Sequence, residues 1–142
     1  MQITKQADYA LRAVIYLARM DNGDKASTRD IAETQKIPPS FLAKIISQLS
    51  IAGLIQTSRG AHGGVALARP GSEISILDVV ESIDGPMLLN ECTSAPHHCA
   101  FGDECPLHKV WCDTRQELDT RLSCATFAPE NLVVHERPAI GI

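Results

Sequence analysis

Thiols and an imidazole that could bind a metal lie close together in the second half of the chain. Cys92, Cys99 and Cys105 fall within fourteen residues, and His108 follows three positions after the last of them. Three thiolates and one imidazole supply the four ligands of a tetrahedral metal site. The same donors suit an iron-sulfur cluster with one ligand other than cysteine. The spacing predicts a zinc site or an iron-sulfur cluster, and a cysteine-rich loop without metal is the alternative.

The other cysteines and histidines of this half are weaker candidates. His97 and His98 are adjacent, so their side chains point apart and are expected to be solvated. Cys112 and Cys124 fall in a helical pattern, where a buried structural cysteine is the default interpretation. The chain has five cysteines, an odd number, and all of them follow residue 90. A metal site is therefore favoured over a disulfide framework.

Three helices are predicted before these residues. Apolar side chains recur at three- and four-residue steps over residues 3–18, which indicates a first helix. Ser27 and Thr28 are candidate caps of a short second helix. Pro39 can occupy the first turn of a third helix that ends at Gly53. The inward face of this third helix would carry four aliphatic side chains: Leu42, Ile45, Ile46 and Leu49.

Two strand-like runs follow the predicted helices. Residues 54–58 and 65–68 are separated by a glycine-rich turn, which predicts a small hairpin. Three helices followed by a hairpin form the layout of a winged helix-turn-helix. The expected fold class is therefore mainly α with a small β-hairpin, a winged helix-turn-helix joined to a long dimerisation helix.

The second half contains a loop between two further helices. Ser75 could cap a helix that stops before Gly85 and Pro86. Residues 90–105 have no apolar period and predict a loop, and a long helix resumes after Pro106. A stripe on that helix is made of residues at four- and three-residue steps: Leu107, Trp111, Thr114, Leu118, Leu122 and Ala125.

The narrow stripe is typical of a seam between two helices. A small winged domain offers little core to cover so long a helix, so we expect a homodimer through it. The predicted organisation is a DNA-binding domain over residues 1–70, a cluster loop with dimerisation helices over residues 71–132, and a loose tail over residues 133–142.

The charge of the chain is divided unevenly between its halves. The net charge is −4, but residues 1–70 hold nine Lys and Arg against five Asp and Glu, whereas residues 71–142 hold four against twelve. The front half, with a net charge of +4, suits a polyanion such as DNA. The start of the chain lacks a signal-peptide pattern, and no segment approaches the roughly 18 apolar residues of a membrane span. A cytoplasmic protein without a membrane partner is expected.

The predicted third helix and the hairpin turn carry side chains that could contact a double-stranded DNA operator. The second helix of a helix-turn-helix motif enters the major groove by its N-terminal end. Arg59 and His62, on the glycine-rich turn, could reach a minor groove or a phosphate. A solvated polar face and an ordinary tight turn are the alternatives. The outward residues of the third helix would be Ser40, Ala43, Lys44, Ser47 and Gln48, with Phe41 at the rim.

Three motifs follow one another along the chain. They are residues 1–4 followed by Asp8-Tyr9-Ala10, residues 58–70 (SRGAHGGVALARP), and the three cysteines of the loop. Together they resemble the bacterial transcription factors that include IscR, NsrR and RirA, over residues 1 to about 132. The resemblance implies a dimeric winged-helix repressor or activator. It further implies that the state of an iron-sulfur cluster controls operator affinity.

The resemblance implies three cluster ligands, Cys92, Cys99 and Cys105, and leaves two candidates for the fourth. His108 matches the histidine that IscR-like members place beside a 2Fe-2S cluster. Asp8 matches the aspartate that NsrR-like members contribute from the partner chain to a 4Fe-4S cluster. Asp8 lies four residues before Arg12, so half of an exposed helical ion pair is its simpler interpretation. The six residues between the first two cysteines depart from the usual five, which leaves the sensing subtype open.

These patterns predict a DNA-binding regulator and no enzyme. The expected signal is iron-sulfur status, redox state or nitric oxide. A winged-helix regulator with structural zinc or with no metal is the first alternative. A thiol-dependent enzyme is the second, but the sequence has no C-x-x-C pair and no evident acid/base constellation.

Overall fold

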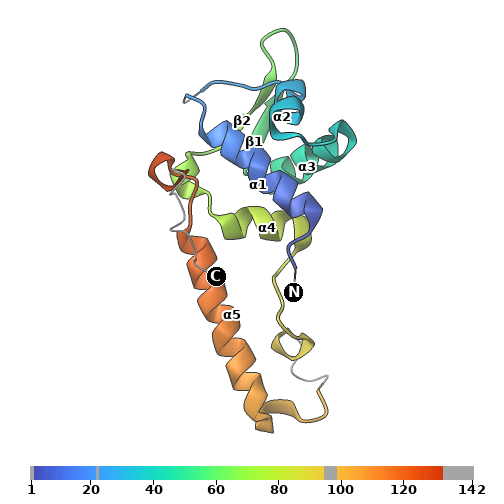
Figure 1. Cartoon of the computed structure of the whole chain (residues 1–142), viewed down its shortest axis with the longest axis vertical. Coiled ribbons are helices and arrows are strands. Elements are labelled where there is room, and N and C mark those ends of the chain that lie inside the picture. The colour runs from blue at the N-terminus through green and yellow to red at the C-terminus, as the bar shows by residue number, and fades with distance from the viewer. Residues whose placement is uncertain (1, 22, 95–98, 133–142) are drawn as a thin grey trace, which may run out of the picture.

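The computed structural model describes residues 2–21, 23–94 and 99–132 of the chain. Within these ranges it contains five α-helices and one two-stranded sheet (Figure 1). No helix of the described ranges is long and apolar enough to span a membrane. The helices are α1 (Lys5–Ala18), α2 (Thr28–Gln35), α3 (Pro39–Ile51), α4 (Ile76–Asp84) and α5 (Pro106–Cys124), and the strands are β1 (Ile55–Ser58) and β2 (Gly64–Leu67).

Helix α1 begins later than its apolar pattern predicts. Thr4 is its N-cap, and the Thr4 hydroxyl accepts a hydrogen bond from the backbone N–H of Ala7 at 3.2 Å. Ile3 has the helical spacing but lies outside the helix and is 42% exposed. The helix begins after Thr4 because the Thr4 side chain satisfies a backbone donor that the first turn leaves free. The buried face of α1 is made of small and aliphatic residues: Ala7, Ala10, Ala13, Val14 and Leu17.

Helices α2 and α3 form the predicted helix-turn-helix. Ser27 caps α2, and its hydroxyl accepts the backbone N–H of Asp30 at 3.0 Å. Lys36 ends the helix in the left-handed conformation, with φ 53°. Pro39 is the first residue of α3, as expected. The predicted inward face of α3 is confirmed, because its buried residues are Leu42, Ile45, Ile46 and Leu49.

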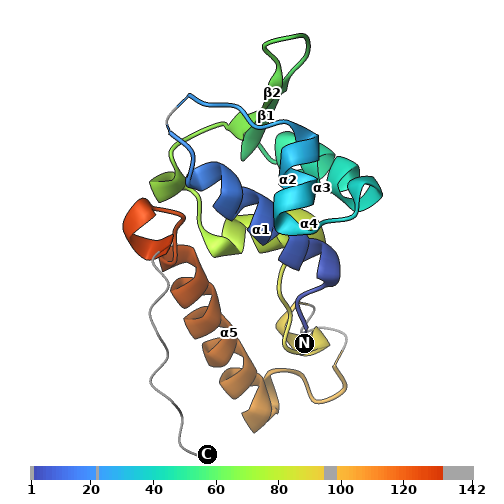
Figure 2. The ribbon, with the colours of Figure 1, turned by 45° about the horizontal axis from the view of Figure 1, so that its top comes forward.

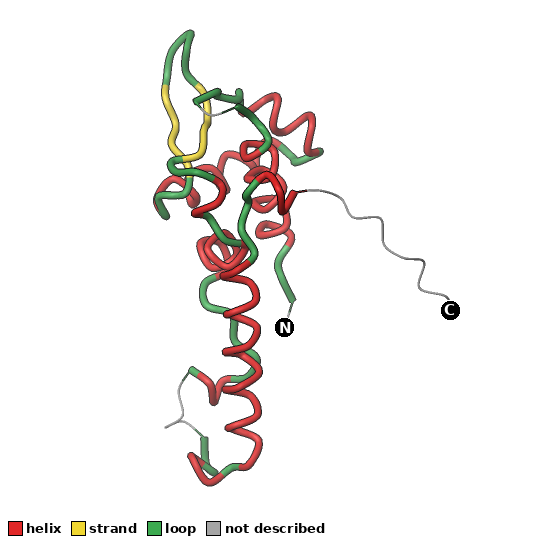
Figure 3. Tube along the Cα trace, turned by 90° about the vertical axis from the view of Figure 1, so that its left-hand side faces the viewer, coloured by secondary structure: helices red, strands yellow, loops and turns green. Residues whose placement is uncertain are grey.

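Strands β1 and β2 form the wing. They pair antiparallel, with Ser58 opposite Gly64 nearest the turn. Gly64 has φ 154°, and a Cβ there would lie 2.8 Å from the carbonyl oxygen of Ala26. The close approach is required because Ala26 pairs with Val65, which fastens the wing to the segment before α2. The turn projects beyond the helices, which is clearest in Figures 2 and 3.

Helix α4 is fixed at its start by a reciprocal cap. The Ser75 hydroxyl accepts the backbone N–H of Asp78 at 3.1 Å, and the Asp78 carboxylate accepts the backbone N–H of Ser75 at 2.9 Å. Ser75 is itself buried. Two donors that would otherwise be unpaired are thereby satisfied.

We expect Ser75→Ala to lower the free energy of unfolding by about 1 kcal/mol, because it removes one side of this cap. Ser82→Ala is the matched control, since the Ser82 hydroxyl only donates to the carbonyl of Val79 within the same helix. Its effect should stay within about 0.5 kcal/mol. Urea titration at one protein concentration measures both, and equal losses would contradict the capping role.

Helix α5 leaves the body of the molecule and is anchored at its C-terminal end. The backbone N–H of Ile76 donates to the carbonyl of Ala125 at 2.8 Å, and that of Phe127 donates to Ile74 at 3.0 Å. Phe127 joins the hydrophobic core built by α1, α3 and the wing, as do Ile74 and Val79. None of the α5 residues is buried in the single chain. The helix therefore extends as an arm from the start of α4 (Figures 1 and 2).

Candidate metal centre and nucleic-acid interface

A pocket of about 310 Å³ lies where the cysteine loop meets the first turns of α5. All three predicted loop ligands and His108 line it, so the structure brings these four donors to one cavity. Two short 3-10 turns shape the loop, at Glu91–Thr93 and Gly102–Glu104. The other lining residues are Asn90, Glu91, Gly102, Leu107 and Trp111.

The surroundings of Cys92 in the pocket affect its thiol. Cys92, Cys99 and Cys105 are each half-buried. Burial first, and then the neighbouring thiols of Cys99, Cys112 and Cys105, raises the pKa of the Cys92 thiol. A raised pKa favours the neutral thiol in the protein alone. A metal cation in the pocket would reverse this preference, because a coordinating thiol is deprotonated.

The chemistry of the donors fits a thiophilic metal, although they are not gathered into a finished coordination shell. Among the described residues, no group of three His, Cys, Asp or Glu has ligand geometry. Soft thiolates and an imidazole beside the apolar side chains of Leu107 and Trp111 nevertheless form a donor set that suits zinc or iron-sulfur chemistry.

Two cysteine predictions are wrong. Cys124 was expected to be buried, and it is exposed near the C-terminal end of α5. Cys112 is half-buried, and its Sγ lies 3.6 Å from Nε2 of His108. The spacing of four residues between His108 and Cys112 was the signal that could have shown this pair, since such residues face each other on a helix. His97 and His98 lie outside the described residues.

Asp8 does not line the pocket of its own chain. Its carboxylate lies on α1, 2.8 Å from a guanidinium nitrogen of Arg12 and 3.6 Å from Nζ of Lys5. The exposed ion pair with Arg12 is the arrangement that the sequence predicted. The same two cations stack over the ring of Tyr9, at 5.6 Å for Arg12 and 5.2 Å for Lys5. This cluster leaves positive charge near the start of α1.

Most of the predicted DNA-facing residues are exposed. The side chains of Ser40, Lys44 and Ser47 are exposed on α3, whereas Gln48 is half-buried. The ring of Phe41 packs edge-on against Tyr9 of α1, with centroids 6.0 Å apart.

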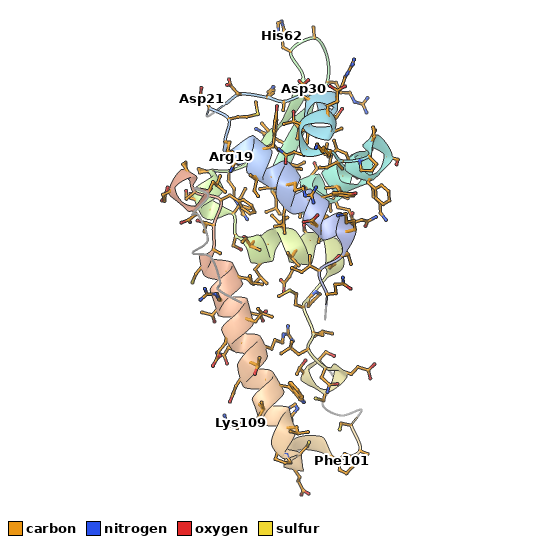
Figure 4. All side chains as sticks on the ribbon, viewed as in Figure 1. Arg19, Asp21, Asp30, His62, Phe101 and Lys109 are labelled. Atoms are coloured by element: carbon orange, nitrogen blue, oxygen red, sulfur yellow. The ribbon has the colours of Figure 1, made fainter. Side chains whose placement is uncertain are left out.

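Arg59 and His62 are exposed on the turn of the wing, and Figure 4 shows His62 at its tip. The turn of the wing and the segment that joins the cysteine loop to α5 lie at opposite ends of the long axis of the molecule, where Figure 4 labels His62 and Phe101 (Figures 1 and 4). No side chain of the wing can therefore touch the cysteine pocket within one chain.

Comparisons with known proteins agree with this architecture. A family model described as Rrf2, iron-dependent transcriptional regulator, matches residues 3–129. A Mycobacterium tuberculosis protein provisionally named an HTH-type transcriptional regulator is 46% identical over 87 residues, which cover 61% of this chain and 54% of that protein. The matched part thus spans about half the length of that relative.

Solved structures share the fold over most of the chain. CymR of B. subtilis, described as its global cysteine regulator, has a TM-score of 0.77 and 27% identity, covering 93% of this chain and 95% of CymR. IscR of T. potens has a TM-score of 0.70 and 24% identity, covering 89% of this chain and 83% of IscR. At 24% identity, the likeness to IscR is a likeness of fold alone.

Proposed function

The chain belongs to the Rrf2 family of iron-dependent transcriptional regulators, and on that basis we propose that it binds DNA under the control of an iron-sulfur cluster. The observation that carries this proposal is the gathering of Cys92, Cys99, Cys105 and His108 around one pocket of a winged-helix protein. Relatives of the chain are transcriptional regulators, so it is not an enzyme.

The three loop cysteines would hold the cluster, and His108 is the fourth ligand that the pocket favours. A bound cluster would supply a redox-sensitive and iron-dependent group that oxygen, nitric oxide or iron scarcity can damage. Asp8 of a second subunit is the competing fourth ligand. In its own chain Asp8 is occupied by Arg12 and Lys5.

The two ends of α4 are connected to the two segments that form the pocket. The loop leaves from the C-terminal end of α4, whereas α5 is anchored at the N-terminal end of α4 by the hydrogen bonds of Ile76 and Phe127. The Asp84 carboxylate at the end of α4 accepts the backbone N–H of Thr4 at 3.1 Å, which connects α4 to the start of α1. Joining the loop to α5 would therefore restrain both ends of α4 at once.

We infer a homodimer through α5. Its stripe residues are half-buried or exposed in the single chain, so a second copy could cover them. An isologous dimer would place two α3 helices for two half-sites of an operator, which are typically one helical turn apart. A change at the pocket would alter the spacing of the α3 helices and thereby the operator affinity.

Visible absorption and metal content of anaerobically purified protein test the cofactor. Iron and inorganic sulfide in equal amounts, with visible absorption, are expected. Colourless protein with stoichiometric zinc would support structural zinc instead, and metal-free protein would support a cluster-free regulator, an option that the likeness to CymR keeps open.

The same spectra separate the two fourth-ligand candidates. We expect His108→Ala to change the absorption and Mössbauer spectra of the cluster, and Asp8→Ala to leave them unchanged. A change in the Asp8 variant alone would assign the ligand to the partner subunit, and no change in either would overturn both assignments.

We expect Arg59→Ala to weaken DNA binding by about 1–3 kcal/mol, because the guanidinium on the wing turn is placed to contact a groove or a phosphate. Duplexes enriched from a random-sequence pool on the wild-type protein serve as the probe, and fluorescence anisotropy across a salt series gives the affinity. Arg121→Ala on α5 changes the net charge equally and is the control. Equal losses in the two variants would show a general charge effect and contradict a contact by the wing.

A further inference from the structure

Helix α5 carries two metal-binding donors on one face, one turn apart. His108 and Cys112 are both half-buried, and Nε2 of His108 lies 3.6 Å from Sγ of Cys112. His108 lines the cysteine pocket, whereas Cys112 is not one of its lining residues and is joined to it through the contact with His108. The contact joins an imidazole to a thiol that the proposed cluster does not use.

The separation of these atoms matches two ligands of one metal atom. Zinc binds a thiolate sulfur at about 2.3 Å and an imidazole nitrogen at about 2.0–2.1 Å. At a tetrahedral angle these two bonds place the ligand atoms about 3.6 Å apart. A thiol-to-imidazole hydrogen bond explains the distance equally well in the metal-free chain. The distance between the two donor atoms therefore fits a shared metal atom as well as a hydrogen bond.

Backbone geometry keeps the two donors on the same face. Residues four apart on an α-helix are neighbours, and α5 is helical from Pro106 to Cys124. The neighbouring charged pair, Lys109 and Asp113, is joined by its own ion pair and is exposed. Lys109 and Asp113 therefore do not bind the imidazole of His108 or the thiol of Cys112.

We propose that Cys112 is a fifth donor of the metal centre and binds the same metal atom as His108. This inference rests on the proposed iron-sulfur function and names a ligand within it. In a 2Fe-2S cluster each iron takes two protein ligands, so His108 and Cys112 would hold one iron and two of the three loop cysteines the other, and the third loop cysteine would not be a ligand in the wild type. A 4Fe-4S cluster, in which each iron takes one protein ligand, does not allow the pair. Four thiols then remain when His108 is removed, which is enough to hold a cluster.

The decisive comparison is between the variants His108→Ala and His108→Ala/Cys112→Ser. We expect the single variant to retain a cluster with a changed visible spectrum, and the double variant to lose about 90% or more of its bound iron. Cys124→Ser, an exposed thiol on the same helix, should match the wild type in iron content and spectrum. Far-UV circular dichroism and thermal unfolding establish that each variant is folded.

A Co²⁺ titration of the metal-free protein tests the ligand without cluster assembly. We expect Cys112→Ser to bind Co²⁺ about tenfold more weakly and to lose part of the sulfur-to-cobalt absorption, because one thiolate is removed. Cys124→Ser should titrate like the wild type.

Three results would overturn the inference: equal iron in the single and double His108 variants when the wild type carries a cluster, a cobalt spectrum unchanged by Cys112→Ser, or a 4Fe-4S cluster in the wild type by native mass spectrometry. If the wild type bound cobalt through Cys112 but assembled no cluster, the proposed function would fail while Cys112 remained a metal ligand.

Discussion

The variant Cys92→Ser/Cys105→Ser is expected to purify without a cluster. It removes two of the thiolates that line the pocket and leaves three of the donors of the same chain: Cys99, His108 and Cys112. Serine hydroxyls are poor ligands for the soft metals that thiolates select. Iron and sulfide contents of anaerobically purified protein should fall by at least about tenfold relative to the wild type.

The fold should survive this double change, which makes the result interpretable. Cys105 is the N-cap of α5 and its side chain makes no capping hydrogen bond. Serine is among the preferred N-cap residues, so the new hydroxyl should support the start of the helix. Cys124→Ser at the other end of α5 serves as the control and should bind iron normally. Retention of a full cluster by the double variant would exclude the loop cysteines as its main ligands.

Ile45→Ala is expected to cause the largest loss of stability of any single truncation proposed here, about 2–5 kcal/mol. Ile45 is fully buried on the inner face of α3, within the core that α1, α4 and the wing share. Removing its side chain leaves a cavity beneath the helix proposed to enter the major groove. Urea-induced unfolding measures the loss, because the midpoint falls while the slope stays constant.

The same helix supplies a matched control. Ile51 has the same side chain but is 86% exposed at the end of α3. Ile51→Ala should therefore change stability by no more than about 0.5 kcal/mol. Similar losses for the two variants would show that α3 does not face the core in solution as described.

The winged helix was predictable because its elements are specified locally. The aliphatic period of α3, with Pro39 at its start, identifies both the helix and its buried face. Ser27 and Ser75 mark helix starts because their hydroxyls cap backbone donors in the structure. Ile3 was misplaced since periodicity alone does not reveal that Thr4 caps α1.

The candidate site was only partly predictable. Spacing in the sequence placed Cys92, Cys99 and Cys105 in one loop beside His108, and the structure gathers these four around one pocket. Cys112 was missed because a cysteine inside a helical pattern is most simply a core residue. Its contact with His108 follows from the spacing of four residues on α5, which does not by itself show that His108 lines the pocket.

The separation of the wing from the pocket constrains any account of regulation. The turn of the wing and the segment that joins the cysteine loop to α5 lie at opposite ends of the long axis (Figure 1), so a cluster could not act on DNA by direct contact within one chain. The cluster could act on DNA binding in two other ways. One is through α4 and α5, and the other is through a second subunit. Both require that the free energy of cluster binding change the relative positions of the two α3 helices.

Control of operator affinity by the cluster is tested by comparing the protein with and without the cluster. Duplexes selected from a random-sequence pool are titrated with cluster-loaded wild-type protein and with the same protein after anaerobic removal of the cluster, at one salt concentration. We predict affinities that differ by at least about tenfold, with the Cys92→Ser/Cys105→Ser variant matching the cluster-free protein. Equal affinities for the loaded and cluster-free proteins would contradict the account.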